Sequence, residues 1–252
     1  MNIEGASVLI TGAAGALGTA FSLDLASRGA EIMACDVRLD ALGGLRELAS
    51  GKALKLETCQ ADVTEEKDVE KLFQVFMERF GRLDAVINNA GVAEDGLLVK
   101  YKGDLLEKFP LPRWRRGLEI NLTGVFLCGR EAAYHMIRQG KGGAIINISS
   151  ISRYGNFIQS NYSATKAAVV ALTVVWAKEL CRYGIRSVAL APGYIDSPLT
   201  GKIPDDVRGR INQQIPLARM GRLDEVTHAL RFAIENDYFN GRVIELDGGL
   251  RI

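Results

Sequence analysis

The stretch "TGAAGALG", residues 11–18, directly follows the apolar run "SVLI" near the N-terminus. A short buried strand that passes through a glycine-rich turn into a helix is typical of dinucleotide-binding folds. The backbone can approach a pyrophosphate closely there, and the helix offers its free N–H groups. The glycines stand at positions 12, 15 and 18, which is neither the G-x-G-x-x-G spacing nor the lysine-containing P-loop pattern. Glycine turns also join strands to helices without any ligand, so the rest of the chain has to decide between the two interpretations.

Seven short apolar runs alternate with longer segments of helical periodicity along the 252 residues. This alternation predicts βαβ units, and runs that lack polar alternation predict strands covered on both faces. We therefore predict an α/β fold: a single Rossmann-type doubly wound parallel sheet of about seven strands with helices on both faces, formed by one domain over residues 1–252. The runs are SVLIT (7–11), EIMACD (31–36), LKLETCQ (54–60), DAVINN (84–89), GAIINIS (143–149), IRSVALAP (185–192) and GRVIELDG (241–248).

The clearest helical segment lies between the third and fourth runs. Thr64 can cap its N-terminus, acidic residues fill the first turn, and Gly81 can end it. Two other stretches, residues 92–112 and 193–218, look irregular. They follow the fourth and sixth runs, so we expect them at the carboxyl edge of the sheet, where open α/β folds bind ligands. Residues 193–218 are the predicted substrate loop.

The composition excludes several classes of protein. Lys plus Arg number 31 and Asp plus Glu number 30, so no basic field for nucleic acid is expected. The four cysteines are far apart, which favours buried thiols in a reducing compartment, and the two histidines lack metal-ligand spacing. No signal peptide is evident and no apolar run is long enough for a membrane span. We expect a cytoplasmic protein without a metal site.

The second apolar run ends at Asp36, 18 residues after Gly18. A carboxylate at this place can accept hydrogen bonds from both hydroxyls of an adenosine ribose and would repel a 2′-phosphate. The glycine-rich turn contains no basic residue that could neutralise such a phosphate. The sequence therefore favours NAD as the cofactor. Arg38, two residues later, can weaken this preference, so NADP remains the alternative.

The segment from residue 145 to residue 180 carries the strongest chemical signal. Tyr162 and Lys166 are four residues apart at the start of a helical pattern and share one face. A tyrosine with its ordinary pKa near 10 is a poor base at neutral pH, and a neighbouring ammonium moves that pKa toward the working range. A serine at the end of the preceding strand could donate to a substrate oxygen. A Tyr-x-x-x-Lys pair alone is also common on helix surfaces, but its position after a strand that ends in Ser-Ser is more specific.

Taken together, the motifs resemble those of the classical short-chain dehydrogenase/reductase family over nearly the whole chain. Within it, "REAAYHMI" (130–137) and "IPLARMGRLDEV" (215–226) are most similar to the bacterial 3-oxoacyl-acyl-carrier-protein reductases. The family motifs are TGAAGALG (11–18), Asp36, ADV (61–63), NNAG (88–91), NLTGVF (121–126), NISS (147–150), YSATK (162–166), PGYIDS (192–197) and DGG (247–249).

The resemblance implies a catalytic set of Asn121, Ser150, Tyr162 and Lys166. Tyr162 would exchange the proton, Lys166 would hold the nicotinamide ribose, and Asn121 would place a water in a relay to Lys166. Asp62 and Val63 would lie at the adenine, and Ile195 and Ser197 at the nicotinamide. The cofactor-binding residues implied in this way are Gly12, Gly15, Ala16, Leu17, Gly18, Asp36, Asp62, Val63, Asn89, Ala90, Gly91, Tyr162, Lys166, Pro192, Gly193, Ile195 and Ser197.

The choice of catalytic serine depends on which feature is aligned. The family's usual spacing of 13 residues before the tyrosine points to Ser149, whereas alignment on the strand "IINISS" points to Ser150. We predict Ser150, because the end of a strand fixes which side chain faces the cleft while loop length varies.

Two further departures concern length. The G-x-x-G-x-x-G spacing resembles the extended branch of the family, but 252 residues leave no room for its larger substrate region. The segment after "NNAG" is longer than the family's usual one.

The activity implied by the resemblance is a nicotinamide-dependent interconversion of a carbonyl and a secondary alcohol, similar to 3-oxoacyl thioester reduction. The partners would be a small-molecule or acyl-thioester substrate and, as one option, acyl carrier protein. Lys141 stands near one basic docking position of the family, whereas Tyr183, beside Arg182, stands at another. The alternatives are an NAD-linked secondary alcohol or 3-hydroxyacyl dehydrogenase and, in a different class, a non-catalytic nucleotide-binding scaffold or sensor.

Assembly is predicted from the segment "AAVVALTVVWA", residues 167–177, which is apolar nearly all round. A helix of this kind needs cover on both sides, and the sheet supplies only one. In the family, two such helices pair with their counterparts in another subunit. We predict a homotetramer, with a dimer as the alternative.

Overall fold

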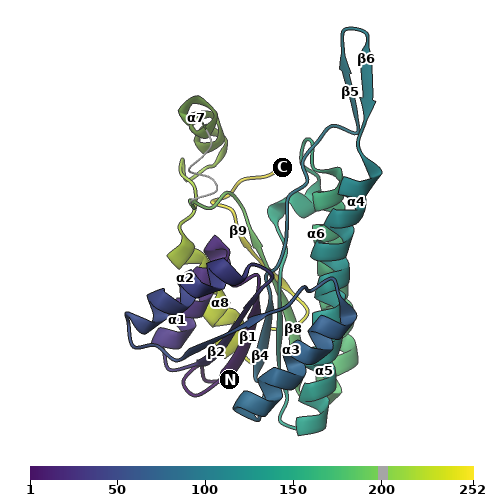
Figure 1. Cartoon of the computed structure of the whole chain (residues 1–252). Coiled ribbons are helices and arrows are strands. Elements are labelled where there is room, and N and C mark those ends of the chain that lie inside the picture. Colours follow the sequence, from purple (N-terminus) through teal and green to yellow (C-terminus); the bar gives the residue numbers. More distant parts are fainter. Residues whose placement is uncertain (198–203) are drawn as a thin grey trace.

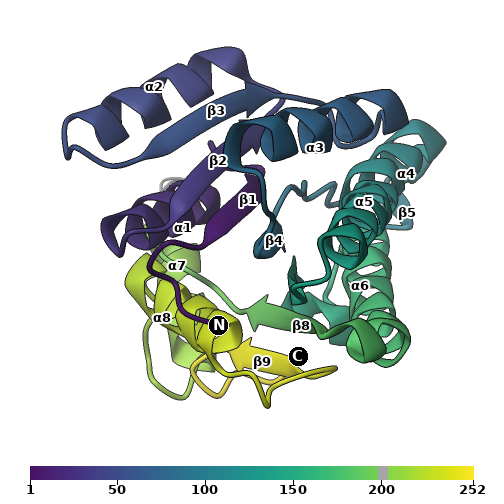
Figure 2. The ribbon, with the colours of Figure 1, turned by 90° about the horizontal axis from the view of Figure 1, so that it is seen from below.

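The computed structural model describes residues 1–197 and 204–252. Its centre is a seven-stranded sheet in the order β3-β2-β1-β4-β7-β8-β9, in which every neighbouring pair is parallel (Figures 1 and 2). All seven predicted strands are present, and the predicted doubly wound fold is confirmed. The strands are β1 (Ser7–Thr11), β2 (Glu31–Asp36), β3 (Leu56–Gln60), β4 (Ala85–Asn88), β7 (Gly143–Ile148), β8 (Ile185–Pro192) and β9 (Val243–Leu246).

Helices cover both faces of the sheet (Figure 2). One face packs against α1 (Ala16–Ser27), α2 (Leu39–Ser50) and α8 (Leu223–Glu235). The other packs against α3 (Glu66–Phe80), α5 (Gly124–Gln139) and α6 (Ser160–Leu180). Neighbouring residues of β1 illustrate the arrangement, since Val8 and Ile10 belong to the first core and Leu9 to the second. Because both faces are buried, the strands read as continuous apolar runs.

The predicted helix before the fourth strand is α3. Gly81 ends it in the left-handed conformation, with φ of 70°. Thr64 does not cap it: the N-cap is Glu65, and the Thr64 hydroxyl donates to Asp62 Oδ1 at 2.7 Å. Thr64 is instead part of the turn before the helix, where its backbone N–H also donates to Asp62 Oδ1, at 2.9 Å.

Residues 92–112 are more regular than the sequence predicted. They contain an antiparallel hairpin of β5 (Val99–Lys102) and β6 (Leu105–Lys108), and they lead into α4 (Leu111–Leu118). The turn is Gly103-Asp104, and Gly103 has φ of 60°. A two-residue glycine turn between two short strands is a recognised hairpin signal, which the irregular appearance of the segment concealed. The hairpin stands out from the body of the molecule (Figure 1).

The predicted substrate loop is partly helical. It contains α7 (Asp205–Gln214), while residues 198–203 of the prediction lie outside the described residues. The loop follows β8 and the hairpin follows β4, so both lie beyond the carboxyl edge of the sheet (Figure 1). These two segments thus flank the edge where a ligand would bind.

Candidate active site

The glycine-rich turn brings three backbone segments close together. Gly12 has φ of 61°, and a Cβ there would lie 2.7 Å from Cα of Ala90. At Gly18 a Cβ would lie 2.3 Å from the carbonyl oxygen of Gly12. Only glycine fits these two positions. Gly15 is the N-cap of α1, which has no side-chain cap and no acidic residue in its first turn.

The start of α1 therefore fits the pyrophosphate of a dinucleotide. The first N–H groups of a helix have no intrahelical acceptor, and no carboxylate competes for those of Ala16, Leu17 and Gly18 in the first turn. The turn itself is held by the side chain of Asn89. Asn89 Nδ2 donates to the carbonyls of Thr11 and Gly12 at 3.1 and 2.9 Å.

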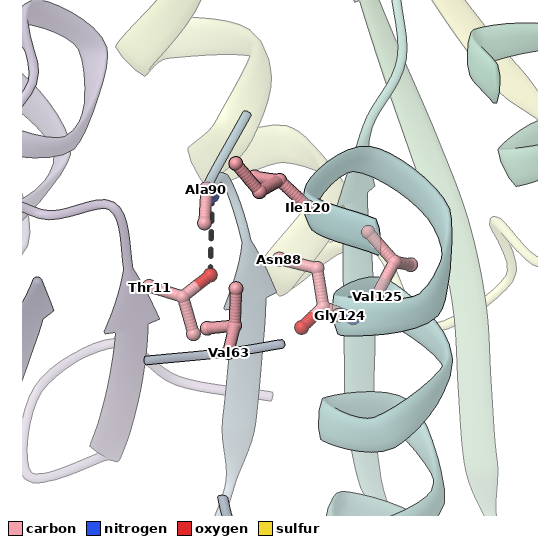
Figure 3. A pocket seen from close by; sticks show the side chains of 7 residues that line it. All are labelled: Thr11, Val63, Asn88, Ala90, Ile120, Gly124 and Val125. Carbon is pink, nitrogen blue, oxygen red and sulfur yellow. Dashed lines mark hydrogen bonds between the residues drawn. The ribbon is translucent and has the colours of Figure 1, made fainter. Parts of the chain in front are cut away.

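The "NNAG" segment is fixed through Thr11. Its hydroxyl accepts hydrogen bonds from the backbone N–H groups of Asn89 and Ala90 at 3.1 and 3.2 Å. Figure 3 shows the narrow pocket beside this contact, which Val63 lines from the segment after β3 and Gly124 lines from the start of α5. Sequence reasoning missed Thr11 as a functional residue, although it is the first residue of the quoted motif.

Asp36 ends β2 as predicted, but it is not a free carboxylate. Its side chain is buried and accepts from the backbone N–H of Ala14 at 3.1 Å. Arg38 donates to it through its backbone N–H, Nε and Nη2, at 3.1, 3.1 and 3.3 Å. This contact raises the pKa of the Arg38 guanidinium. The predicted ribose position thus holds a carboxylate and a half-exposed guanidinium side by side.

The two candidate serines point in different directions. The Ser149 hydroxyl is buried and donates to the main-chain carbonyl of Lys166 at 2.8 Å. The Ser150 hydroxyl accepts from the backbone N–H of Ser152 at 3.1 Å, and it lies near enough to Tyr162 to lower the pKa of the phenol. Ser150 is therefore the serine that lies beside the tyrosine.

Burial dominates the titration of Tyr162. It raises the pKa of the phenol above its ordinary value, while the hydrogen bond from Ser150 lowers it and the charge of Asp95 raises it further. The sequence predicted that Lys166 would move this pKa downward. Instead, Lys166 Nζ lies 5.6 Å from the centre of the Tyr162 ring and donates to the carbonyl of Ile148 at 2.7 Å. In the ligand-free chain, burial of the phenol therefore decides the direction in which its pKa shifts.

Lys166 is itself buried, and desolvation lowers its pKa to about 8. Gly91 leaves room for it, since a Cβ there would lie 3.5 Å from Lys166 Nζ and 3.2 Å from Asn121 Oδ1. The ammonium of Lys166, the Asn121 amide and the end of "NNAG" therefore lie close together.

Asn121 lies in a π-helical turn, Glu119–Thr123, between α4 and α5. Its amide forms a two-way pair with the backbone of Val92, accepting from the N–H and donating to the carbonyl, both at 2.8 Å. Wide turns of this kind are frequent at functional sites. The side chain is thus committed to holding the segment after β4, and the π-helical turn had no signal in the sequence.

A buried polar chain connects the sheet to α6. Asn88 Nδ2 donates to Asn147 Oδ1 at 2.8 Å, and Asn147 Nδ2 donates to the Thr173 hydroxyl at 2.9 Å. Side chains that satisfy one another in this way fix the position of a helix on a sheet. These hydrogen bonds therefore help to position α6, which carries Tyr162 and Lys166. The sequence did not predict this role for Asn147 or Thr173.

The predicted nicotinamide-end residues follow β8. Gly193 donates to the carbonyl of Leu246 at 2.9 Å, and a Cβ there would lie 3.0 Å from Cα of Asp247. Ile195 is buried and forms a bridge with Gly221. Ile195 and Ser197 both continue from the carboxyl end of β8, beyond Pro192.

The predicted docking positions lie at the other end of the sheet. Lys141 precedes β7, and Tyr183, whose hydroxyl accepts from Arg182 at 2.6 Å, follows α6. Tyr162 stands in the first turn of α6, so about 30 Å of helix separates it from Tyr183. A partner bound at these positions would be remote from the candidate catalytic residues.

Two observations concern other kinds of site. Among residues 1–197 and 204–252, no three His, Cys, Asp or Glu side chains are grouped so that they could hold a metal ion. Within the same residues, no helix is both long and apolar enough to cross a membrane.

Comparison with known proteins identifies relatives over the full length. The chain is 38% identical to the 3-oxoacyl-[acyl-carrier-protein] reductase FabG of Thermotoga maritima, covering 100% of both chains. It is 36% identical to the (3R)-3-hydroxyacyl-CoA dehydrogenase of Canis lupus familiaris, covering 99% of this chain and 98% of the relative. Among solved structures, levodione reductase superposes with a TM-score of 0.88 at 33% identity, covering 97% of this chain and 96% of that one.

The family model described as short chain dehydrogenase matches residues 6–208. This match includes the glycine-rich turn, Asp36 and the Ser150–Tyr162–Lys166 group. The chain belongs to the short-chain dehydrogenase family, and it is an oxidoreductase of CH–OH groups that uses a nicotinamide cofactor.

Proposed function

We propose that residues 1–252 act as one domain that interconverts a 3-oxoacyl thioester and its 3-hydroxy form, mainly with NAD(H). The observation that carries this proposal is the contact between Ser150 and Tyr162 with Lys166 behind them, because it joins a hydroxyl donor, a proton donor and a cation at one cleft. The thioester follows from the two relatives, whose names specify an acyl-carrier-protein ester and a coenzyme A ester.

In the proposed mechanism, Ser150 and Tyr162 hold the substrate carbonyl oxygen by hydrogen bonds. When bound, the nicotinamide supplies or accepts the hydride. Tyr162 donates its proton to the oxygen during reduction and takes it back during oxidation. The raised pKa of its phenol keeps the hydroxyl protonated before reduction. Lys166, whose pKa is about 8, can pass a proton toward Tyr162 near neutral pH.

Asn121 acts in this mechanism through the backbone. Its side-chain amide is bonded to Val92, so we assign the relay water to main-chain carbonyls of the π-helical turn instead of the amide. The pair with Val92 holds that turn next to Lys166.

The cofactor-binding residues are assigned by their positions at the carboxyl edge. The N-terminus of α1 would bind the pyrophosphate, Asp36 the adenosine ribose, Asp62 and Val63 the adenine, and Lys166 the nicotinamide ribose. NAD is proposed over NADP because Asp36 lies at the ribose. NADP is the alternative because the guanidinium of Arg38 donates hydrogen bonds to the same carboxylate.

Initial rates test this proposal. Acetoacetyl-coenzyme A should be reduced with NADH at a higher kcat/KM than with NADPH. The same measurement with 3-hydroxybutyryl-coenzyme A and NAD tests the alternative of a 3-hydroxyacyl dehydrogenase, and secondary alcohols test the wider alternative. Tyr162→Phe should lower kcat by about 10²–10⁴-fold while NADH still binds. Binding of NADH without turnover of any substrate would favour the scaffold or sensor.

We also propose a homotetramer, with a dimer as the alternative. The outer face of α6 is a stripe of small apolar residues, Ala164, Ala167, Ala171 and Val175, and all four are exposed. The outer face of α5 beside it exposes the large residues Phe126, Tyr134 and Ile137. An exposed apolar surface of two neighbouring helices favours association with a second copy. Sedimentation equilibrium should detect no monomer at micromolar concentration.

A further inference from the structure

Asp95 lies beside the start of the helix that carries Tyr162. Its two carboxylate oxygens accept hydrogen bonds from Gln159 Nε2 at 3.1 and 3.2 Å, and Gln159 is the N-cap of α6. The next residue, Gly96, donates its N–H to the carbonyl of Ile158 at 2.7 Å. The first contact places the carboxylate at the N-cap of α6, three residues before Tyr162, and the second holds the backbone beside it.

The loop before α6, which contacts the Asp95 segment, contains a strained residue. Ile158 has φ of 64°, a left-handed conformation that is rare for a β-branched residue and costs about 1–3 kcal/mol. This conformation presents the Ile158 carbonyl to Gly96. Strain of this kind close to the helix that carries Tyr162 indicates that the loop geometry matters for function.

The charge of Asp95 is not neutralised by a direct ion pair within the described part of the chain. The nearest guanidinium, that of Arg113, donates Nε to Glu94 at 2.9 Å and Nη2 to the main-chain carbonyl of Asp95 at 2.8 Å. Arg116 likewise binds Glu94, at 2.7 Å. Both guanidinium groups thus form ion pairs with the Glu94 carboxylate. The Asp95 carboxylate accepts hydrogen bonds from the neutral amide of Gln159.

The negative charge of Asp95 affects the titration of Tyr162. Its charge raises the pKa of Tyr162, although Asp95 is exposed. A negative charge that disfavours a phenolate at this position would also disfavour a second anion bound against Tyr162.

We propose that Asp95 is a specificity-determining residue that rejects substrates with a carboxylate close to the reacting carbonyl. The proposal rests on the proposed function and narrows its substrate class to neutral ketones, such as thioesters and esters of 3-oxo acids, as opposed to the free acids. The carboxylate acts from its place at the N-cap of α6 and takes no part in hydride or proton transfer.

A matched substrate pair tests this proposal in the NADH-bound chain. Ethyl acetoacetate and acetoacetate share the reacting ketone and differ in charge. The wild-type chain should reduce the ester at a much higher kcat/KM. Asp95→Asn keeps the shape of the side chain and removes its charge, so kcat/KM for acetoacetate should rise about tenfold, which corresponds to about 1.4 kcal/mol. The value for the ester should stay within about threefold.

Asp104→Asn is the matched control, because Asp104 is an exposed carboxylate in the turn of the same hairpin segment. It should leave both rates unchanged. A second readout is the pH profile for the ester, whose tyrosine-dependent limb should move to lower pH in Asp95→Asn only. Equal ester-to-acid ratios in the wild-type chain and Asp95→Asn would overturn the proposal, and loss of stability alone would assign Asp95 to the capping of α6.

Failure of the proposed function gives a different result. If neither ketone is reduced, fluorescence titration of the NADH-bound chain with the same two ligands replaces the rates. Asp95→Asn should then bind acetoacetate about tenfold more tightly than the wild-type chain, the same factor as before. Unchanged acetoacetate binding would overturn the role of Asp95 independently of catalysis.

Discussion

The hydroxyl of Ser149 donates to the main-chain carbonyl of Lys166 at 2.8 Å. This contact ties the end of β7 to the second turn of α6 and turns Ser149 away from the cleft. Its neighbour Ser150 faces Tyr162 as a result. Two adjacent serines thus have separate tasks, one in packing and one at the candidate catalytic centre.

Replacement of the two serines should separate these tasks. Ser150→Ala should lower kcat by about 10²–10⁴-fold, because it removes a hydrogen-bond donor at the reacting oxygen. Ser149→Ala should lower the free energy of unfolding by about 1 kcal/mol and leave kcat within about threefold. Steady-state rates and denaturant unfolding measure the two effects. The opposite ranking of the rates would identify Ser149 as the catalytic serine.

Burial of Lys166 predicts a pH-dependent stability. Its pKa falls from 10.5 to about 8 on folding, so between these values the unfolded chain binds more protons than the folded chain. The contribution of Lys166 to the free energy of unfolding should therefore rise with pH through this window, by up to about 3 kcal/mol. Lys166→Met should lose this rise, as measured by guanidinium chloride unfolding of the cofactor-free chain at pH 7.5 and 10. Lys178→Met, an exposed position on the same helix, should keep it. Identical pH dependence in all three chains would contradict the burial of the ammonium.

The pairing of Arg38 with Asp36 predicts how cofactor preference can be changed. Asp36→Ser should release the guanidinium and raise the ratio of kcat/KM for NADPH over NADH by roughly ten- to hundredfold, since charge-assisted hydrogen bonds contribute about 1.5–3 kcal/mol. The double variant Asp36→Ser/Arg38→Leu should lose most of this gain. A gain that persists without Arg38 would show that another group binds the 2′-phosphate.

Arg153 is predicted to position the serine turn. It forms an ion pair with Glu245 of β9, and its Nη1 donates to the carbonyl of Ser150 at 3.4 Å. Arg153→Met should lower kcat about tenfold through displacement of Ser150, while KM for NADH stays within about twofold. Arg153→Lys should restore part of kcat. Arg182→Met, at the far end of α6, should change neither. A fall in Tm with kcat unchanged would assign Arg153 a purely structural role.

The strands and the Tyr162–Lys166 pair could be predicted from the sequence because they depend on local patterns. Apolar runs define buried strands, and a four-residue spacing defines one helix face. The contact of Asp95 with Gln159 joins residues 64 positions apart, and no local pattern encodes it. The left-handed Ile158 is likewise imposed by the segment that it meets.

The pKa shifts of Tyr162 and Lys166 were the other feature that the sequence could not predict. The spacing of Tyr162 and Lys166 indicated the sign of their mutual effect, but the depth of burial decides the net shift of each pKa. Burial depends on the whole fold. For the same reason Asp36 was expected to be an open ribose acceptor, whereas the folded chain gives it Ala14 and Arg38 as partners.

The hairpin of β5 and β6 lies between β4 and α4, beyond the carboxyl end of the central strand, and it adds no strand to the seven-stranded sheet. Its length can therefore change over evolutionary time while strand order, register and the glycine-rich turn stay as they are. Mutation and selection can act on this segment, with Asp95 at its base, and leave the hydride-transfer apparatus untouched. A lineage could acquire a new substrate range in this way without reinventing its chemistry.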